Sequence, residues 1–284
     1  MLYLHHVFNG IWMIDSDYAT NFLPLVTNYI KGDIKEKPAT KENELTISFA
    51  TRQSDKFTVT PYGYYSAPEA APEDSVAIIH INGAITKHDQ WCGPDGMLAY
   101  ASLMDRCYAN DNITGIILSM ESGGGEAYAM RVMNDAIARR NKPVVGFVDD
   151  FAASAAYGII SGCDHIVANS PQAMVGSIGA YQTIADYTEY FKLQGINLIE
   201  IYATQSKDKN QDFHEAIKGN LEPLRKKIDV FNESFLSMVE TNRSGKISGE
   251  RKEWGTGKMF FAEEAIAIGL IDEINSLENV LNSF

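Results

Sequence analysis

The stretch ITGIILSMESGGGEAYAMRVMNDAIARRNKPVVGFV, residues 113 to 148, decides the fold class. An apolar run ends at a glycine-rich loop, and a segment with apolar residues at helical spacing and a second apolar run follow it. These patterns are typical of a buried strand, an amphipathic helix and another buried strand. The order strand, helix, strand predicts a βαβ unit of a parallel sheet.

The same alternation continues on both sides of this unit. VAIIHING, from Val76, predicts a buried strand that ends in a turn at Gly83. Further along, the pattern predicts a helix from about Ser154, a strand over 165–169, a turn over 170–179, a helix over 185–195 and a strand over 197–203. A long helix with an apolar stripe begins at Glu222, and a short strand, a helix and a last strand close the domain near Ile274. We therefore expect an α/β domain over residues 76–284.

Residues 1–75 differ from this domain in composition and predict a small α+β appendage. An amphipathic helix is expected over residues 17–32, and a pair of short strands around residues 45–50 and 56–65. The Pro, Ala and Glu run over residues 67–75 predicts an extended linker, because its prolines disfavour a helix and it has few apolar side chains.

Composition excludes several classes of function. The 284-residue chain has a formal net charge of −13, which argues against binding to nucleic acid or to anionic lipid. Its three cysteines are widely spaced, with neither a disulfide framework nor paired metal-ligand spacing. The N-terminus shows neither a secretory signal nor a membrane-spanning segment. We expect a cytoplasmic protein without a metal or cofactor, acting on a neutral or polypeptide substrate.

Two loops could carry chemistry, since each follows a buried strand and precedes a helix. In Ser122-Gly123-Gly124-Gly125, the missing side chains leave backbone N–H groups open to a substrate carbonyl, as in an oxyanion hole. The alternative is a flexible turn. In the second loop, Ser154 is either a nucleophile, with the N–H of Ala155 as a second oxyanion donor, or an N-cap of the helix.

A nucleophilic serine needs a base, and the sequence offers two kinds. His5, His6, His80 and His165 lie in the appendage or on expected strands, whereas His88 and His214 fall in expected loops and stay open. Lysine is the other kind, provided that burial makes its neutral form accessible. Lys207 and Lys209 follow the strand expected at 197–203 and could reach the edge of the sheet, or could be solvated loop residues.

The order of these motifs resembles the signal peptide peptidase A family, S49-type serine peptidases on the ClpP/crotonase fold. A glycine loop after a strand, a serine at a helix start, a G-S-I-G turn and a lysine beyond the next strand appear in family order, and the closing segment runs to GLIDEI. The resemblance covers about residues 76–274 and implies stacked βαβ units. It implies a dyad of Ser154 and Lys207, with Lys209 close enough to exchange roles with Lys207.

The resemblance also implies supporting residues. Ser177 corresponds to a serine that orients the lysine, and the oxyanion hole would use Ala155 with Gly125 or Gly124, of which Gly125 is favoured. Two departures are mild: the family's S-P-G-G is Ser122 to Gly125 here, and alanines follow the serine. The Ser, His, Asp triad of the ClpP branch is disfavoured, because residues 177–184 contain no histidine.

The N-terminal segment W-x-I-D-x-x-Y-A, residues 12–19, resembles the phage-type members, which process scaffold or capsid proteins in head maturation. The resemblance thus implies a serine endopeptidase that works as a homo-oligomer, in the bacterial host cytoplasm if phage or prophage encoded, without a membrane anchor. Two alternatives stay open: a non-catalytic assembly or scaffold protein on the same fold, and a crotonase-like acyl-CoA enzyme, which would need neither serine nor lysine.

Overall fold

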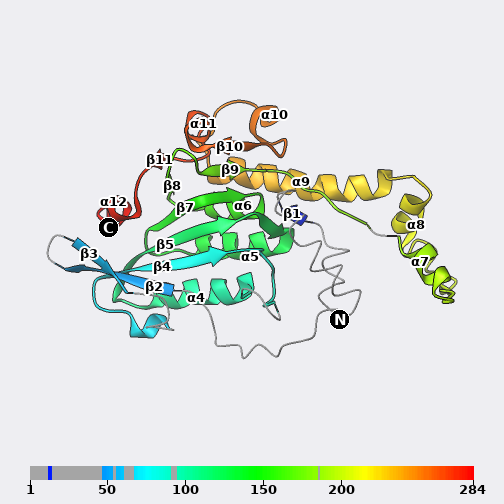
Figure 1. Ribbon diagram of the computed structural model, residues 1–284, viewed down its shortest axis with the longest axis horizontal. Helices are drawn as coiled ribbons and strands as arrows, with labels where there is room; N and C mark the ends of the chain where they lie inside the picture. The colour runs from blue at the N-terminus through cyan, green and yellow to red at the C-terminus, as the bar shows by residue number, and fades with distance from the viewer. Residues whose placement is uncertain (1–11, 15–46, 54–55, 61–66, 91–94, 185) are drawn as a thin grey trace.

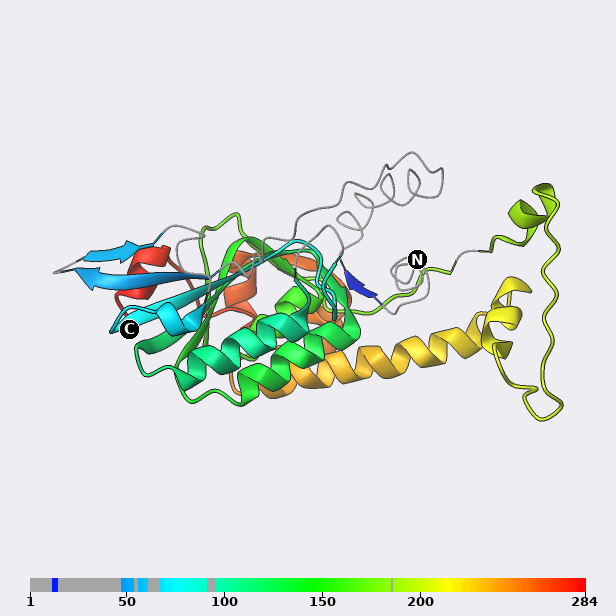
Figure 2. The same cartoon turned by 90° about the horizontal axis from the view of Figure 1, so that it is seen from below.

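The computed structural model describes residues 12–14, 47–53, 56–60, 67–90, 95–184 and 186–284. The helix expected over residues 17–32 lies outside these residues. The described part forms a mixed sheet with helices on both faces, and a long arm extends from it (Figures 1 and 2). This arrangement confirms the expected α/β class.

Nine strands make up the main sheet. Its path runs β10 (Met259–Phe261), β9 (Met174–Gly176), β7 (Val144–Ala153), β5 (Ile113–Ser122), β4 (Ser75–Asn82), β2 (Ile47–Gln53) and β3 (Lys56–Val59), with β8 (His165–Ala168) beside β7 and β11 (Glu273–Ile274) beside β8. Strands β4, β5, β7 and β8 are parallel, as the βαβ reading predicts. The carboxyl ends of these strands therefore meet at one edge.

Helices cover the two faces of the sheet unequally. The larger core lies under α4 (Met97–Ala109), α5 (Ala127–Ala138) and α6 (Ala155–Ile160), whose inner side chains pack on the sheet. On the other face, α12 (Leu277–Leu281) covers a smaller core. The short strand, helix and last strand predicted near the end of the chain are present as β10, α11 (Ala262–Ala267) and β11.

Of the two structural predictions for residues 45–75, the strand pair is present and the extended linker is not. The strand pair is confirmed as β2 and β3, but β2 also pairs with β4, so the main sheet extends across the expected boundary at Val76. The prediction of an extended linker over residues 67–75 is wrong, because Pro68–Ala70 form a 3₁₀ helix. This helix is hydrogen bonded to the end of α4. Asn110 Nδ2 donates to the Pro68 carbonyl at 2.6 Å, and Arg106 pairs with Glu69. These polar contacts hold the segment in place.

The arm contains the clearest departure from the sequence prediction. It consists of α7 (Thr188–Leu193), the connection to α8 (Gln211–Ile217) and the first half of α9 (Glu222–Asn242) (Figure 2). Residues 197–203, expected as a strand of the core, form no strand, and Ile201 is 90% exposed. Their alternating apolar pattern has no sheet to pair with in the described part of this chain. In α9 the buried residues are Phe235, Leu236 and Val239, all in the second half of the helix.

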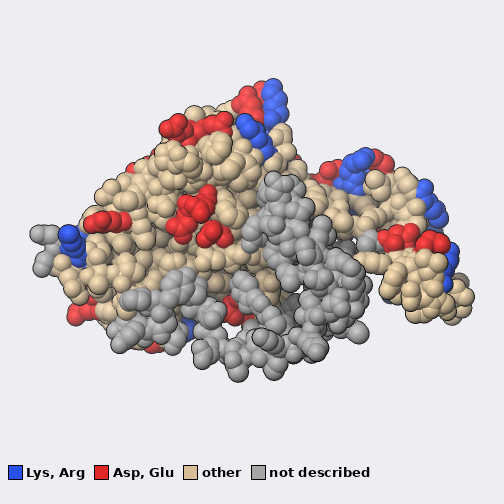
Figure 3. All heavy atoms as spheres, viewed as in Figure 1, with Lys and Arg blue, Asp and Glu red and all other residues tan. Residues whose placement is uncertain are grey.

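Charged side chains are distributed unevenly on the face in Figure 3: acidic ones lie in the middle of the domain, and both signs occur at its edges and on the arm. None of the described helices is both long and apolar enough to cross a bilayer. Among the described residues, no three His, Cys, Asp or Glu side chains form a group that could hold a metal ion.

A buried ion pair fixes the C-terminal segment to α9. The Arg243 side chain is almost fully buried and donates to both carboxylate oxygens of Asp272, at 2.9 and 3.0 Å. Asp272 also accepts from Lys246 and from the backbone N–H of Ile166. Burial alone would raise the pKa of Asp272, but hydrogen bonds from Arg243 and Lys246 outweigh it and lower the pKa to about 2.

Replacing Asp272 is expected to destabilise the fold strongly. Asp272→Asn leaves the buried Arg243 guanidinium uncompensated, so the free energy of unfolding should fall by about 3–5 kcal/mol in urea titrations at pH 7. The matched control is Asp105→Asn, which breaks an exposed pair with Arg139 and should change the stability far less than Asp272→Asn does. Because the Asp272 pKa is lowered in the folded state, its contribution is present above about pH 4 and disappears as the pH falls toward about 2. Equal effects of the two variants at pH 7 would contradict this account.

Candidate active site

Ser154 lies at the junction of β7 and α6, at the carboxyl edge of the parallel strands. Its backbone is unusual, with φ 56° and ψ −118°, a conformation that costs a non-glycine residue energy. Its N–H donates to the Gly176 carbonyl at 2.7 Å, and its carbonyl accepts from Gly158 at 2.9 Å. Ser154 stands in the N-cap position of α6 but makes no side-chain cap hydrogen bond there. The interpretation of Ser154 as a helix cap therefore has no support in the described helix.

The N–H of Ala155 opens α6. As the first residue of a helix it has no acceptor four residues earlier within that helix, so it is available to a group outside. The alanines at 153, 155 and 156 are fully buried, and Ser154 itself is only 1% exposed, so the site is covered in this structure. The roles of Ser154 as nucleophile and Ala155 as oxyanion donor stay predictions.

The glycine loop packs against this junction. The Ser122 hydroxyl donates to the Gly83 carbonyl and accepts from the Gly124 N–H at 3.1 Å, which fixes the turn. Gly124 has φ 98°, and a Cβ built on it would lie 2.9 Å from the Ala153 carbonyl oxygen and 3.0 Å from the Ala155 nitrogen. Only glycine fits here, because the loop packs tightly against the backbone of residues 153–155. The alternative prediction of a flexible turn is therefore wrong.

Gly125 belongs to a short strand, β6 (Gly124–Glu126), beside residue Ile85. The Ile85 N–H donates to the Gly124 carbonyl and its carbonyl accepts from the Glu126 N–H, both at 2.9 Å. Because the polar groups of an extended strand alternate in direction, the N–H of Gly125 points to the opposite edge. The Gly124 N–H, in contrast, is held by Ser122. The N–H groups of Gly124 and Gly125 therefore point to different neighbours, and the preference for Gly125 as oxyanion donor stays a prediction.

Ser177 lies next to Ser154 on the neighbouring strand. Ala153 of β7 is paired with Gly176 of β9, so the residues that follow them, Ser154 and Ser177, are adjacent at the ends of their strands. Ser177 is buried, has φ 51°, and donates its N–H to the Lys258 carbonyl at 2.8 Å. The predicted turn over 170–179 thus contains β9, a strand that the sequence analysis missed.

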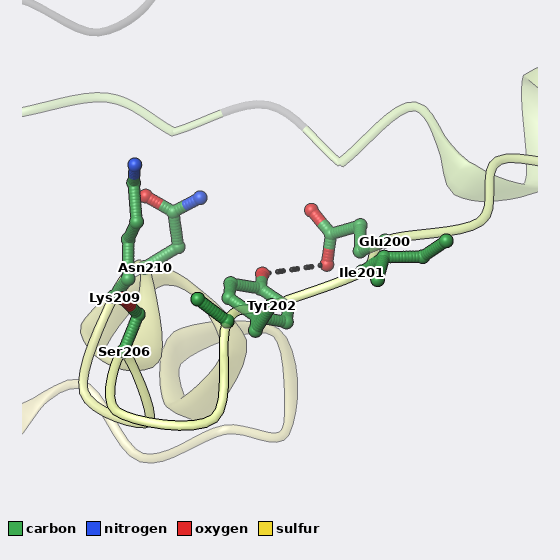
Figure 4. A pocket seen from close by; sticks show the side chains of 7 residues that line it. Glu200, Ile201, Tyr202, Ser206, Lys209 and Asn210 are labelled. Carbon is green, nitrogen blue, oxygen red and sulfur yellow. Dashed lines mark hydrogen bonds between the residues drawn. The ribbon is translucent and has the colours of Figure 1, made fainter.

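The lysines do not join this group within one chain. Lys207 and Lys209 lie in turns between residue 203 and α8, on the arm, away from β7 and α6 in both ribbon views (Figures 1 and 2). Lys209 lines a shallow hollow of about 330 Å³ with Tyr202 and Asn210, where Tyr202 donates to Glu200 at 3.0 Å (Figure 4). The expectation that a core strand would carry a lysine to Ser154 is wrong, because that strand is absent from the described part of the chain.

Three of the described histidines bond to other groups. His80 Nε2 lies 2.9 Å from Ser48 Oγ, and burial lowers the pKa of His80, an effect that the nearby Asp149 opposes. His165 pairs with Glu273, and His214 with Glu200 on the arm. His88 is exposed and lies three residues after Ile85, the residue that bonds to β6. Within its described residues, the structure therefore assembles Ser154, Ala155, Gly125 and Ser177, but not a base.

Comparison with known proteins identifies relatives of this chain. The model of peptidase family S49 matches residues 136–284, which include Ser154, Ser177 and both lysines. The putative protease MJ0651 of Methanocaldococcus jannaschii is 32% identical over 64% of this chain and 58% of that protein. The Na(+)/H(+) antiporter NhaA of Brucella melitensis is 27% identical over 96% of this chain and 38% of that protein. The head-tail preconnector protein GP5 of Enterobacteria phage P21 is 24% identical over 72% of this chain and 40% of that protein.

The chain thus spans from 38 to 58% of the length of these relatives. Solved structures that resemble it include an enoyl-CoA hydratase/isomerase family member, at 20% identity over 75% of this chain and 71% of that one, with a TM-score of 0.44. A mutant of ClpP1 from Listeria monocytogenes matches at 15% identity over 72% of this chain and 94% of that one, also with a TM-score of 0.44.

Proposed function

Because the chain belongs to peptidase family S49, we propose that it is a serine endopeptidase in which Ser154 is the nucleophile. The observation that carries this proposal is the backbone of Ser154, a non-glycine residue at φ 56° with no cap bond, at the sharp turn from β7 into α6. Sharp strand-to-helix turns of this kind present nucleophilic hydroxyls in hydrolases. Strain of this kind gathers at functional sites.

The oxyanion hole consists of the N–H groups of Gly125 and Ala155. When Ser154 Oγ attacks a peptide carbonyl, the carbonyl carbon becomes tetrahedral and the carbonyl oxygen takes the negative charge. Donors held in place by the loop around Ser122 and by α6 stabilise that charge without reorganising. The amine then leaves with a proton, an acyl group stays on Ser154, and water releases it in a second step.

Lys207 is the base of this proposal, and a second copy of the chain brings it to Ser154. Lys207 is exposed on an arm that carries uncovered apolar side chains, above all Leu198, Ile199 and Ile201. Such an area on a soluble protein marks a contact surface. Packing the arm on a neighbouring copy would cover these side chains and bring the Lys207 amine to Ser154, where it accepts the serine proton. Ser177, beside Ser154, would orient the incoming amine.

The substrate of this proposal is an unfolded polypeptide. A backbone-lined site accepts extended chains, because its donors contact the main chain of any sequence. The similarity to the head-tail preconnector protein GP5 supports scaffold or capsid proteins as the natural substrate. The proposed reaction uses side chains and backbone groups of the protein alone.

The direct test is digestion of denatured, fluorescein-labelled casein by the full chain, in a preparation shown by scattering to be oligomeric. We expect peptide fragments whose release stops after treatment with an alkyl fluorophosphonate. Intact casein after prolonged incubation with a folded oligomer would favour the non-catalytic assembly protein. Turnover of an acyl-CoA thioester with casein left intact would favour the crotonase-like enzyme.

A further inference from the structure

A short segment near the start of the chain lies on the strand that carries Gly125. Strand β1 (Trp12–Ile14) pairs antiparallel with β6, with Met13 opposite Gly125. These two strands form a sheet separate from the nine-stranded one. Figures 1 and 2 show β1 at the end of the domain from which the arm leaves.

The pairing uses the edge of β6 that the proposed mechanism needs. Ile85 occupies the other edge, through the Gly124 carbonyl and the Glu126 N–H. The N–H and C=O of Gly125 therefore face β1, and the residue opposite them is Met13. The same N–H is the oxyanion donor proposed above.

The carbonyl oxygen of Met13 lies close to the proposed oxyanion hole. A Cβ built on Gly124 would lie 2.3 Å from the Met13 oxygen and 3.0 Å from the Ala155 nitrogen, so one point is close to both atoms. The Met13 oxygen thus lies near both Gly124 and the start of α6, where we expect the carbonyl of a bound peptide. Glycine at 124 makes this approach possible.

The side chain of Met13 fills an apolar pocket. It is 2% exposed and belongs to the larger core cluster of the domain. A methionine is long and unbranched, so a pocket that it fills accepts other medium-sized apolar side chains. Backbone pairing to an exposed strand, with one side chain in a pocket, is how extended peptides bind by strand addition.

We propose that residues 12–14 occupy the strand position of the substrate, so that the chain blocks its own site until β1 is displaced. This inference rests on the proposed peptidase function. It adds a regulatory strand, β1, and a preference for substrates with a medium-sized apolar side chain. A polypeptide reaches Ser154 only in the fraction of molecules in which β1 has left β6. A substrate with a medium-sized apolar side chain at the Met13 position competes best for the vacated groove.

The test is binding of a fluorescein-labelled peptide GIWMIDS, residues 10–16, to full-length variants, measured by fluorescence anisotropy. Met13→Lys places a charge in the apolar pocket and should expel β1. We expect this variant to bind the peptide about tenfold tighter than the unchanged chain, because the binding-competent fraction rises by a factor of this order. The conservative Met13→Leu should behave like the unchanged chain. If Met13→Lys does not fold, Met13→Pro replaces it, since proline removes the N–H that faces β6.

The inference is overturned if the folded Met13→Lys or Met13→Pro variant binds the peptide with the same affinity as the unchanged chain. The rate at which a fluorophosphonate labels Ser154, followed in the same samples, separates this result from failure of the proposed function. Tighter peptide binding without labelling would keep β1 as the occupant of the groove and reject the peptidase proposal. Labelling at equal rates, with no gain in peptide binding, would keep the peptidase and reject the blocking strand.

Discussion

Replacing Ser154 by alanine is expected to lower the rate of casein cleavage by about 10⁴-fold or more, because no acyl-enzyme can form without the hydroxyl. The same change should leave stability nearly unaltered. A serine that caps a helix loses roughly 0.5–2 kcal/mol on replacement by alanine, whereas Ser154 makes no cap bond to α6. Activity is measured by fragment release, and stability by urea denaturation of the same preparations.

The control for Ser154→Ala is another buried serine of the same region. Ser161, at the end of α6, donates to the Gly158 carbonyl at 2.7 Å and accepts from Asn242 at 2.9 Å. Ser161→Ala should lose stability, because it breaks these bonds, but should keep its activity wherever it is folded. Cleavage by Ser154→Ala at an undiminished rate, or a loss of stability like that of Ser161→Ala, would return Ser154 to a structural role.

Replacing Lys207 by alanine is expected to lower activity by about 10²- to 10⁴-fold, the usual contribution of a general base. Lys209→Ala is the matched control, since Lys209 lies two residues away in the same exposed connection. His88→Ala tests the exposed histidine that follows the Ile85 segment. If Lys209→Ala is the inactive variant, the two lysines exchange roles. If His88→Ala is inactive and both lysine variants are active, the dyad is excluded.

Mixing two inactive variants tests whether the base comes from a second copy. Ser154→Ala supplies Lys207, and Lys207→Ala supplies Ser154, so a mixed oligomer contains some complete sites. Random assembly of equal amounts should restore about one quarter of the activity of the unchanged chain. The two proteins are unfolded and refolded together, and samples refolded separately and then combined at low temperature serve as the blank. No recovery in a co-assembled oligomer would contradict a site shared between copies.

Local patterns were enough to predict the centre of the fold. The runs around residues 113 and 144 are long and apolar, and the segment between them has a helical period, so tertiary contacts reinforce what each segment favours. The same patterns placed Ser154 and Gly125 at the ends of adjacent strands. Their adjacency follows from parallel topology, which is why the glycine loop and the serine could be placed side by side without a structure.

The remaining elements depend on contacts that a single sequence does not reveal. Residues 197–203 alternate like a strand, but they lie exposed on the arm and pair with no strand among the described residues. The 3₁₀ helix at Pro68–Ala70 is set by hydrogen bonds from α4, a helix that the sequence analysis did not identify. The pairing of β1 with β6 joins segments far apart in the sequence, and no local pattern specifies such a partner.

The central claim is that Ser154 is the nucleophile, and the location of a covalent adduct tests it most directly. The full chain and the Met13→Lys variant are treated with an alkyl fluorophosphonate at pH 8, digested, and analysed by mass spectrometry. The account predicts one phosphonylated residue, Ser154, labelled faster in the variant and unlabelled after Lys207→Ala. A folded oligomer that carries no adduct at Ser154 in either form, or carries it on another serine, would contradict the account.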